Sequence, residues 1–214
     1  MTLYALDGVA PVVHPTAWVH PDATVIGRVE LGPEVSIWPQ AVLRGDYGEI
    51  RIGARTSIQD GTVLHTTEQH PTVVGADCVV GHLAHLEGCL VGDRVLIGSN
   101  SVVLNRVVIE DGALVGAGAL VAEGTLVPAD HRALGVPARI SAGAGTAAFV
   151  ESAVAMYVEN ARRYRDGLTV VGRPLSRFGG GPQGRHCAYR TQSTRHRIPA
   201  GGGHGEAGAL PGPE

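Results

Sequence analysis

The sequence predicts a parallel β-helix, a fold in which short strands coil into a prism with three flat faces. An aliphatic residue recurs at every sixth position through the middle of the chain, and glycine often follows it. A period of six matches neither an α-helix nor a simple alternating strand, and it is typical of such coils. Aromatic residues make up only 4% of the chain, as expected for an interior of stacked Val, Ile, Leu and Ala. The recurring aliphatic residues are Ile52, Ile58, Leu64, Val74, Val80, Leu86, Ile97, Val103, Ile109, Val115, Val121 and Val127.

The coils are expected to occupy residues 25–138. Residues 1–24 are rich in proline and are expected to cap the first coil, because the open end of a β-helix exposes apolar side chains and backbone edges. Gly-Pro and Asp-Gly pairs mark corners within the repeat. Pro128 and Pro137 mark its end, since proline cannot donate a hydrogen bond to the strand ladder.

Residues 147–167 are predicted to form an amphipathic α-helix. Its apolar stripe recurs at helical spacing, and we expect it to pack along the β-helix or against a neighbouring subunit. Residues 179–214 consist largely of Gly, Pro, Arg, His and Ser, so a disordered tail is predicted there. The residues of the helical stripe are Val150, Val154, Tyr157, Val158, Ala161 and Tyr164.

Composition narrows the classes of function. The 214-residue chain has a net charge of -3 and therefore no global electrostatic reason to bind nucleic acid. Every basic residue is Arg, which rules out a lysine nucleophile or Schiff base. No apolar stretch approaches the ~20 residues of a membrane span, and the start does not resemble a signal peptide, so a cytoplasmic location is expected. Cys78 and Cys89 form no CxxC pair and are expected to be reduced thiols packed in or near the core.

Two polar residues occupy positions where the repeat elsewhere carries glycine. His65 follows Leu64, and Glu87 follows Leu86, 22 residues later. One coil of three hexapeptides has 18 residues, so four residues must be looped out, and residues 66–71 have the composition of such a loop. His65 and Glu87 then occupy equivalent positions on successive coils, ~4.8 Å apart. Two side chains at that separation can bind one ion.

His82 completes the candidate metal site only across a subunit interface. It precedes Glu87 by five residues, which span ~16 Å when extended, so it cannot reach the same ion within one chain. A three-fold trimer brings the edge of one prism against the face of the next and supplies the missing histidine. The pattern therefore predicts a homotrimer with a metal site at each interface. His70, His85 and His131 are expected to be solvated surface histidines, although His85, two residues before Glu87, is also an alternative third ligand.

Several separate motifs resemble the γ-class carbonic anhydrase family over residues 9–165. This resemblance implies a left-handed β-helix, a homotrimer with a metal at each interface, and reversible hydration of CO2 to bicarbonate by a metal-bound hydroxide. The motifs are Trp38-Pro39, Arg44-Gly45-Asp46, Ile58-Gln59-Asp60-Gly61-Thr62-Val63-Leu64-His65, Pro71-Thr72-Val73-Val74-Gly75, Val80-Gly81-His82 and Gly135-Val136-Pro137-Ala138-Arg139.

The resemblance also assigns ligands to the metal. His65 matches the first family ligand, and His82 matches the second, which comes from the neighbouring subunit. The third family ligand is a histidine, but this chain carries Glu87 at that place. Two histidines and one carboxylate suit Zn²⁺, the expected metal, with Fe²⁺ as the alternative. The carboxylate cancels one unit of metal charge, so hydratase activity is expected either at a raised pH optimum or not at all.

Four further residues receive roles from the same resemblance. Gln59 orients the hydroxide or the substrate by hydrogen bonding. Arg44, Asp46 and Asp60 tie the subunits together and orient the site. For Arg44 and Asp46, a purely structural ion pair at the interface is the alternative.

Two other classes of function remain open at the level of sequence. Hexapeptide-repeat proteins often transfer acyl groups from CoA or acyl carrier protein, and His85 or His65 would then be the base. A non-catalytic trimeric scaffold would retain the ligands by descent. The repeat cannot discriminate among these classes, because fold does not determine function.

Overall fold

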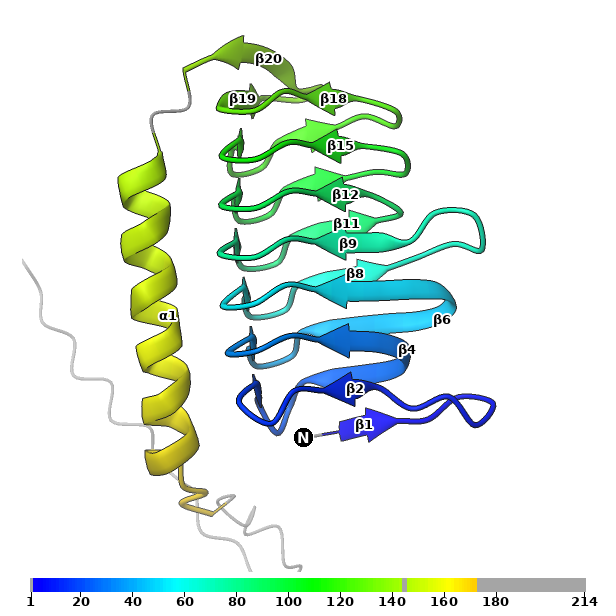
Figure 1. Cartoon of the computed structure of the whole chain (residues 1–214), viewed down its shortest axis with the longest axis vertical. Helices are drawn as coiled ribbons and strands as arrows, with labels where there is room; N and C mark the ends of the chain where they lie inside the picture. The colour runs from blue at the N-terminus through cyan, green and yellow to red at the C-terminus, as the bar shows by residue number, and fades with distance from the viewer. Residues whose placement is uncertain (1, 144–145, 173–214) are drawn as a thin grey trace, which may run out of the picture. The chain divides into compact units, whose positions relative to one another are not determined.

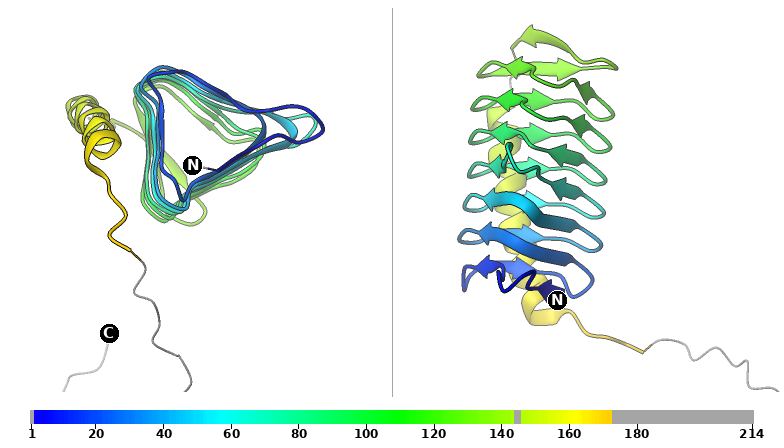
Figure 2. Two further views of the ribbon diagram at one scale, coloured as in Figure 1. Left: turned by 90° about the horizontal axis from the view of Figure 1, so that it is seen from below. Right: turned by 90° about the vertical axis from the view of Figure 1, so that its right-hand side faces the viewer.

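The computed structural model describes residues 2–143 and 146–172 and shows a left-handed parallel β-helix followed by one helix, α1 (Ala147–Gly167). The predicted disordered tail, 179–214, lies outside these residues. The coils stack along one axis with α1 beside them (Figure 1), and their cross-section is triangular (Figure 2). No helix in the described part of the chain is long and apolar enough to cross a membrane.

The strands form three faces, which we call the histidine face, the open face and the helix face. The histidine face consists of β1 (Thr2–Tyr4), the first halves of β4 (Thr24–Leu31) and β6 (Val42–Ile52), β8 (Val63–His65), β11 (His85–Glu87), β14 (Val102–Val103) and β17 (Leu120–Val121). The open face consists of β2 (Val12–Val13), the second halves of β4 and β6, β9 (Thr72–Val74), β12 (Leu90–Val91), β15 (Val108–Ile109) and β18 (Leu126–Val127). The helix face consists of β3 (Trp18–Val19), β5 (Ser36–Ile37), β7 (Ser57–Ile58), β10 (Val79–Val80), β13 (Leu96–Ile97), β16 (Leu114–Val115), β19 (His131–Leu134) and the antiparallel β20 (Arg139–Ala142).

The interior is built from columns of aliphatic residues in register. On the histidine face the column contains fully buried side chains from six coils, which are Val25, Leu43, Leu64, Leu86, Val103 and Val121. Side chains alternate across a strand, so the residue after each column member points outward. Cys78 and Cys89 fill small corner positions and are fully buried, which confirms the sequence prediction. Burial raises the pKa of each thiol to about 12.

Parallel pairing begins before residue 25. Strand β1 pairs with Thr24–Ile26 of β4, β2 pairs with the end of β4, and β3 pairs with β5. The N-terminal segment thus forms a coil of its own at the open end of the prism. The insertion predicted between coils is confirmed, because residues 66–71 form a loop between β8 and β9.

Helix α1 packs against the helix face, where it contacts β3, β5, β7 and β10. Its buried residues are Val150, Val154 and Ala161, all members of the predicted apolar stripe. Ala161 and two tyrosines of the stripe pack on the outward-facing Trp18 and Trp38. The helix is therefore held against the coils by its apolar side, as the sequence predicts.

Candidate functional site

His65 and Glu87 are opposite each other on neighbouring strands of the histidine face. The two residues are paired in register between β8 and β11, and Nδ1 of His65 lies 3.2 Å from Oε1 of Glu87. Their preceding residues, Leu64 and Leu86, are fully buried, so both polar side chains point outward. The register predicted by removing four looped residues is confirmed.

Arg44 and Asp46 extend this group by one coil. Arg44 is paired in register with His65, and its guanidinium forms an ion pair with the Asp46 carboxylate. The other oxygen of Asp46 lies 3.1 Å from Nε2 of His65. Burial would raise the pKa of Asp46, but hydrogen bonds from Arg44, from the backbone and from His65 outweigh it and lower that pKa. A charged Asp46 therefore orients the His65 ring.

His85 shares the outward side of β11 with Glu87 but does not occupy the position above His65. It is paired in register with Val63, and its Nε2 lies 3.4 Å from Oε2 of Glu87. Glu87 is therefore the residue of β11 that contacts His65, and His85 contacts Glu87 from the middle of the face.

The remaining candidate residues lie at the opposite edge of the histidine face, His82 in the corner between β10 and β11, and Gln59 and Asp60 one coil earlier in the corner between β7 and β8. Nδ1 of His82 lies 2.8 Å from Oδ2 of Asp60, which leaves its Nε2 free to act as a ligand. Gln59 is buried next to Tyr157 of α1. Burial and the negative charge of Asp60 raise the pKa of Tyr157, and a hydrogen bond between Gln59 and Tyr157 partly offsets that effect.

The candidate residues thus divide into two half-sites, one at each edge of the same face. The first, called the His65 half-site, contains Arg44, Asp46, His65 and Glu87. The second, called the His82 half-site, contains Gln59, Asp60 and His82. Within residues 2–143 and 146–172, no three His, Cys, Asp or Glu side chains of one chain converge into a complete ligand set.

The donor atoms of the His65 half-site suit a divalent ion. Two ligand atoms ~2.1 Å from a tetrahedral ion lie roughly 3.4 Å apart, close to the observed separation of the His65 nitrogen and the Glu87 oxygen. Histidine ligands commonly present their second nitrogen to a carboxylate, which fixes the ring and its tautomer. Both His65 and His82 have such a carboxylate, in Asp46 and Asp60.

Two residues that the sequence analysis did not single out hold the His65 half-site in place. The buried Thr72 hydroxyl donates to the carbonyl oxygen of His65 at 2.5 Å and accepts from the backbone N–H of Gly88 at 2.8 Å. Gly88 follows Glu87 with a φ of +58°, and a Cβ there would meet Oδ1 of Asn105 at 2.2 Å. A threonine seven residues beyond a candidate ligand gives no sequence signal, because its partners are brought together only by the loop.

Tyr47 forms the outer rim of this half-site. Its ring stands edge-on to His65, with centroids 6.3 Å apart, and it is 61% exposed. Its backbone N–H donates to Asp46, so the rim and the orienting carboxylate are part of one turn.

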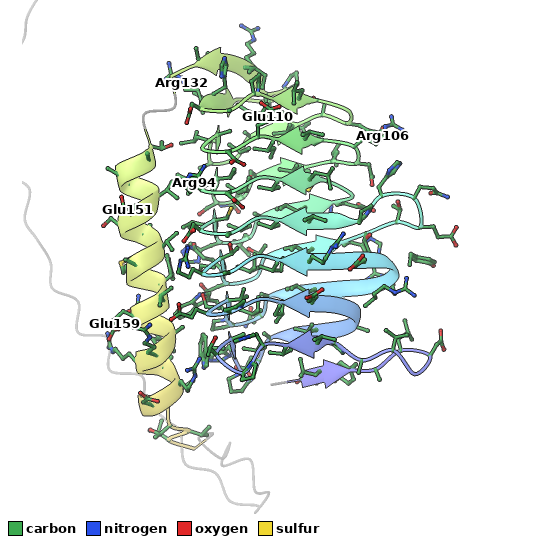
Figure 3. The ribbon with its side chains drawn as sticks, in the orientation of Figure 1. Arg94, Arg106, Glu110, Arg132, Glu151 and Glu159 are labelled. Carbon is green, nitrogen blue, oxygen red and sulfur yellow. The ribbon has the colours of Figure 1, made fainter. Side chains whose placement is uncertain are left out.

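A groove of about 620 Å³ lies between α1 and the corner where the open and helix faces meet. Figure 3 shows Arg94 on the α1 side of the coils and Arg106 on the opposite side. The arginines of the groove are each paired with a carboxylate, in the pairs Arg55–Asp77, Arg94–Asp111 and Arg162–Glu34. The groove therefore offers little free positive charge to an anionic cofactor.

Comparison with known proteins places the chain in a family. The bacterial transferase hexapeptide (six repeats) profile matches residues 71–105 and 88–123. A solved hexapeptide transferase family protein from Anaplasma phagocytophilum is 34% identical, with a TM-score of 0.73 over 76% of this chain and 98% of that one. The chain belongs to the hexapeptide transferase family.

Two further proteins are similar to this chain over different spans. A Bacillus cereus protein assigned as an acetyltransferase is 33% identical, with a TM-score of 0.74 over 77% of this chain and 97% of that one. The carnitine operon protein CaiE of Escherichia coli K12 is 49% identical over 105 residues, which are 49% of this chain and 54% of CaiE. The chain thus spans about half the length of the curated relatives it matches.

Proposed function

We propose that this protein is a γ-carbonic-anhydrase-like metalloprotein that hydrates CO2 reversibly to bicarbonate at the interfaces of a homotrimer. The observation that carries the proposal is the division of the ligand set into two half-sites at opposite edges of one face. A three-fold axis parallel to the axis along which the coils stack would bring the His82 edge of one protomer against the His65 edge of the next. Each interface then contains one complete set.

His65 and Glu87 of one protomer and His82 of its neighbour would hold the ion. Zn²⁺ suits two imidazoles and a carboxylate with an open fourth position, and Fe²⁺ is the alternative. When bound, such an ion supplies a Lewis acid that brings the ionisation of a coordinated water toward neutral pH.

The surrounding residues would orient the ligands and the substrate. Asp46, held charged by Arg44, accepts from Nε2 of His65 and leaves Nδ1 facing Glu87. Asp60 does the same for His82, and its contact with Nδ1 leaves Nε2 to face the neighbour. Gln59 is next to Asp60 but is buried and in contact with Tyr157 of α1 in one protomer, so its proposed role toward the substrate depends on the trimer interface.

The test is metal content together with stopped-flow CO2 hydration. We expect about one ion per protomer in purified trimers. His65→Ala and His82→Ala should each remove that ion and the activity while leaving the coils folded, because neither side chain fills the interior columns. His131→Ala, on the helix face, is the matched control. Metal-free wild-type protein, or full metal occupancy in either of the first two variants, would contradict the proposal.

The two solved relatives named for transfer chemistry support a second candidate, acyl transfer without a metal. His65 paired with Asp46, or His85 paired with Glu87, would then act as the general base. The neutralised charges of the α1 groove do not favour an anionic acyl donor there. Turnover of acetyl-CoA by metal-free protein, lost in His65→Ala or His85→Ala, would support this candidate over hydration.

A further inference from the structure

Leu83 has a backbone conformation that this chain otherwise gives to polar residues or glycine. Its φ is +59°, in the left-handed region. Ten non-glycine residues have a positive φ in the described part of the chain, and the other nine are polar. One and two coils further along, the equivalent corner residues are Asn100 and Gly118. Asparagine and glycine adopt this conformation at little cost, whereas leucine is strained there.

The side chain of Leu83 is also 61% exposed in the protomer. It leans toward the preceding coil, because a Cβ built on Gly61 would lie 2.6 Å from Cδ2 of Leu83. The corner therefore combines backbone strain with exposed apolar surface, although Asn100 shows that a polar residue fits the same conformation. An apolar contact outside the protomer would account for both features.

The inference about Leu83 rests on the proposed function, because it uses the trimer described there. Leu83 directly follows His82, so in that trimer it lies on the edge that meets the His65 half-site of the neighbour. The outer rim of that half-site is Tyr47, which is also 61% exposed and stands edge-on to His65. Each edge thus presents one large exposed hydrophobic side chain beside its candidate ligand.

The two exposed side chains occur at the same height along the stack. The coils of β6, β8 and β11 follow one another along it (Figure 1). Leu83 comes from the coil of β11 and leans over Gly61 toward the coil of β8. Tyr47 comes from the coil of β6, and its ring stands beside His65 of β8. A rotation about an axis parallel to the stack leaves heights unchanged, so it would bring Leu83 of one protomer level with Tyr47 of the next.

An ion held between the two edges leaves a gap that these side chains can span. Two histidines that bind one ion from opposite sides hold their Cα atoms at most ~12 Å apart. A tyrosine reaches ~6.5 Å from its Cα, a leucine reaches ~2.6 Å, and van der Waals contact adds ~4 Å. The combined reach, roughly 13 Å, lets a ring and a methyl group meet beside the ion.

We propose that Leu83 is an anchor of the trimer interface, packed on Tyr47 of the neighbouring protomer. The partner is a second copy of this chain. Burying the leucine against the ring removes apolar surface from water and offsets the strain at a φ of +59°. The contact closes the side of the metal site that faces the N-terminal end of the stack, and it places apolar groups rather than solvent beside His65 and His82.

Leu83→Asn tests the anchor, because asparagine occupies the equivalent corner of the next coil. Exchange of subunits between isotope-labelled and unlabelled Zn²⁺-loaded trimers is followed by native mass spectrometry. Loss of a buried leucine from each interface should accelerate exchange by at least about tenfold. Leu126→Asn is the control, because it removes a leucine that is 52% exposed on the open face.

A crosslink tests the contact itself. Tyr47→Cys and Leu83→Cys are combined in one chain, Cys187 is replaced by serine, and the protein is treated with a short bismaleimide. The two remaining native cysteines are buried. Positions 47 and 83 lie at opposite edges of the histidine face, so crosslinks should join protomers and give covalent trimers on a denaturing gel. Tyr47→Cys combined with Leu126→Cys should give none.

The outcomes separate this contact from the proposed function. Exchange in Leu83→Asn no faster than in Leu126→Asn would overturn the anchor and leave the metal site standing, and so would trimers that give no crosslinked product. Crosslinked trimers together with a wild type that lacks metal or CO2 hydration would support the anchor and contradict the proposed function. A wild type that stays monomeric at saturating Zn²⁺ would overturn both.

Discussion

Glu87 is directly above His65, one coil further along the prism, with Oε1 of the carboxylate 3.2 Å from Nδ1 of the imidazole. The pair sits at one edge of the histidine face, and His82 sits at the other. This separation explains why a complete site requires a second protomer. It also defines how substitutions at each position should behave.

Glu87→His tests the charge of the ligand set. Exchanging the carboxylate for a neutral imidazole in the same register removes one negative charge from the site. Water at the site should then ionise at lower pH, so CO2 hydration at neutral pH should become faster. Stopped-flow rates across a pH series measure the shift, with Glu110→His on the exposed corner of the open face as control. An unchanged profile, combined with loss of metal in His85→Ala, would transfer the third-ligand role to His85.

Thr72→Val removes one hydroxyl that connects His65 and Gly88. Both polar partners are left without their buried bonds, so the free energy of unfolding should fall by about 1–3 kcal/mol. Metal affinity should also fall, by roughly 10–100-fold, as for other residues that orient ligands. Urea unfolding and competition with a chelator measure the two effects. Thr125→Val is the control, because its hydroxyl donates to only one carbonyl oxygen, at an exposed position. An equal loss of metal affinity in both variants would show that Thr72 does not support the metal ligands.

Gly88→Ala separates backbone strain from packing. Gly88 and Gly118 both have positive φ, at +58° and +67°, so alanine is strained at either position by about 1–2 kcal/mol. Only at Gly88 would the new Cβ collide with neighbours, Asn105 and His70. Gly88→Ala should therefore destabilise the protein more than Gly118→Ala, as judged by thermal or urea unfolding. Equal effects would show that the corner beside Glu87 has room for a side chain.

The buried thiols predict a pH dependence. The pKa values of Cys78 and Cys89, both raised to about 12, keep them neutral in the folded protein well above pH 9. In the unfolded chain they lose protons near ~8.5, so stability should decrease as the pH rises from there toward 12. The third cysteine of the chain, Cys187, is replaced by serine for this test, and iodoacetamide at pH 8.5 should then label neither buried residue until urea is added. Rapid labelling of the native protein would contradict their placement in the interior corners.

Much of the fold was predictable because the aliphatic residues that recur every six positions are the residues that form the interior columns. The pairing of His65 with Glu87 followed from one subtraction, since 22 residues less a four-residue insertion make one coil. The start of the strand ladder was harder to predict from the sequence, because residues 2–19 pair in register without a regular hexapeptide pattern. The burial of Thr72 and its contacts with the backbone depend on a loop, so the hexapeptide pattern does not predict them.

The site itself was predictable only in part. Sequence spacing placed His82 one face away from Glu87, and the structure places it in a separate corner with Asp60. The burial of Gln59 depends on where α1 packs, which the helical stripe does not specify. The joining of the two half-sites depends on symmetry between chains and stays a prediction.

Mixed trimers give the most direct test of a site shared between protomers. His65→Ala and His82→Ala chains, each inactive alone, are co-expressed in equal amounts, and CO2 hydration and metal content are measured on the purified trimers. An interface is complete only when the His82→Ala chain supplies His65 and the His65→Ala chain supplies His82. Random assembly achieves this at about one interface in four. About a quarter of wild-type activity and metal is expected. Activity no higher than that of either variant alone, in trimers shown to contain both chains, would contradict the shared site.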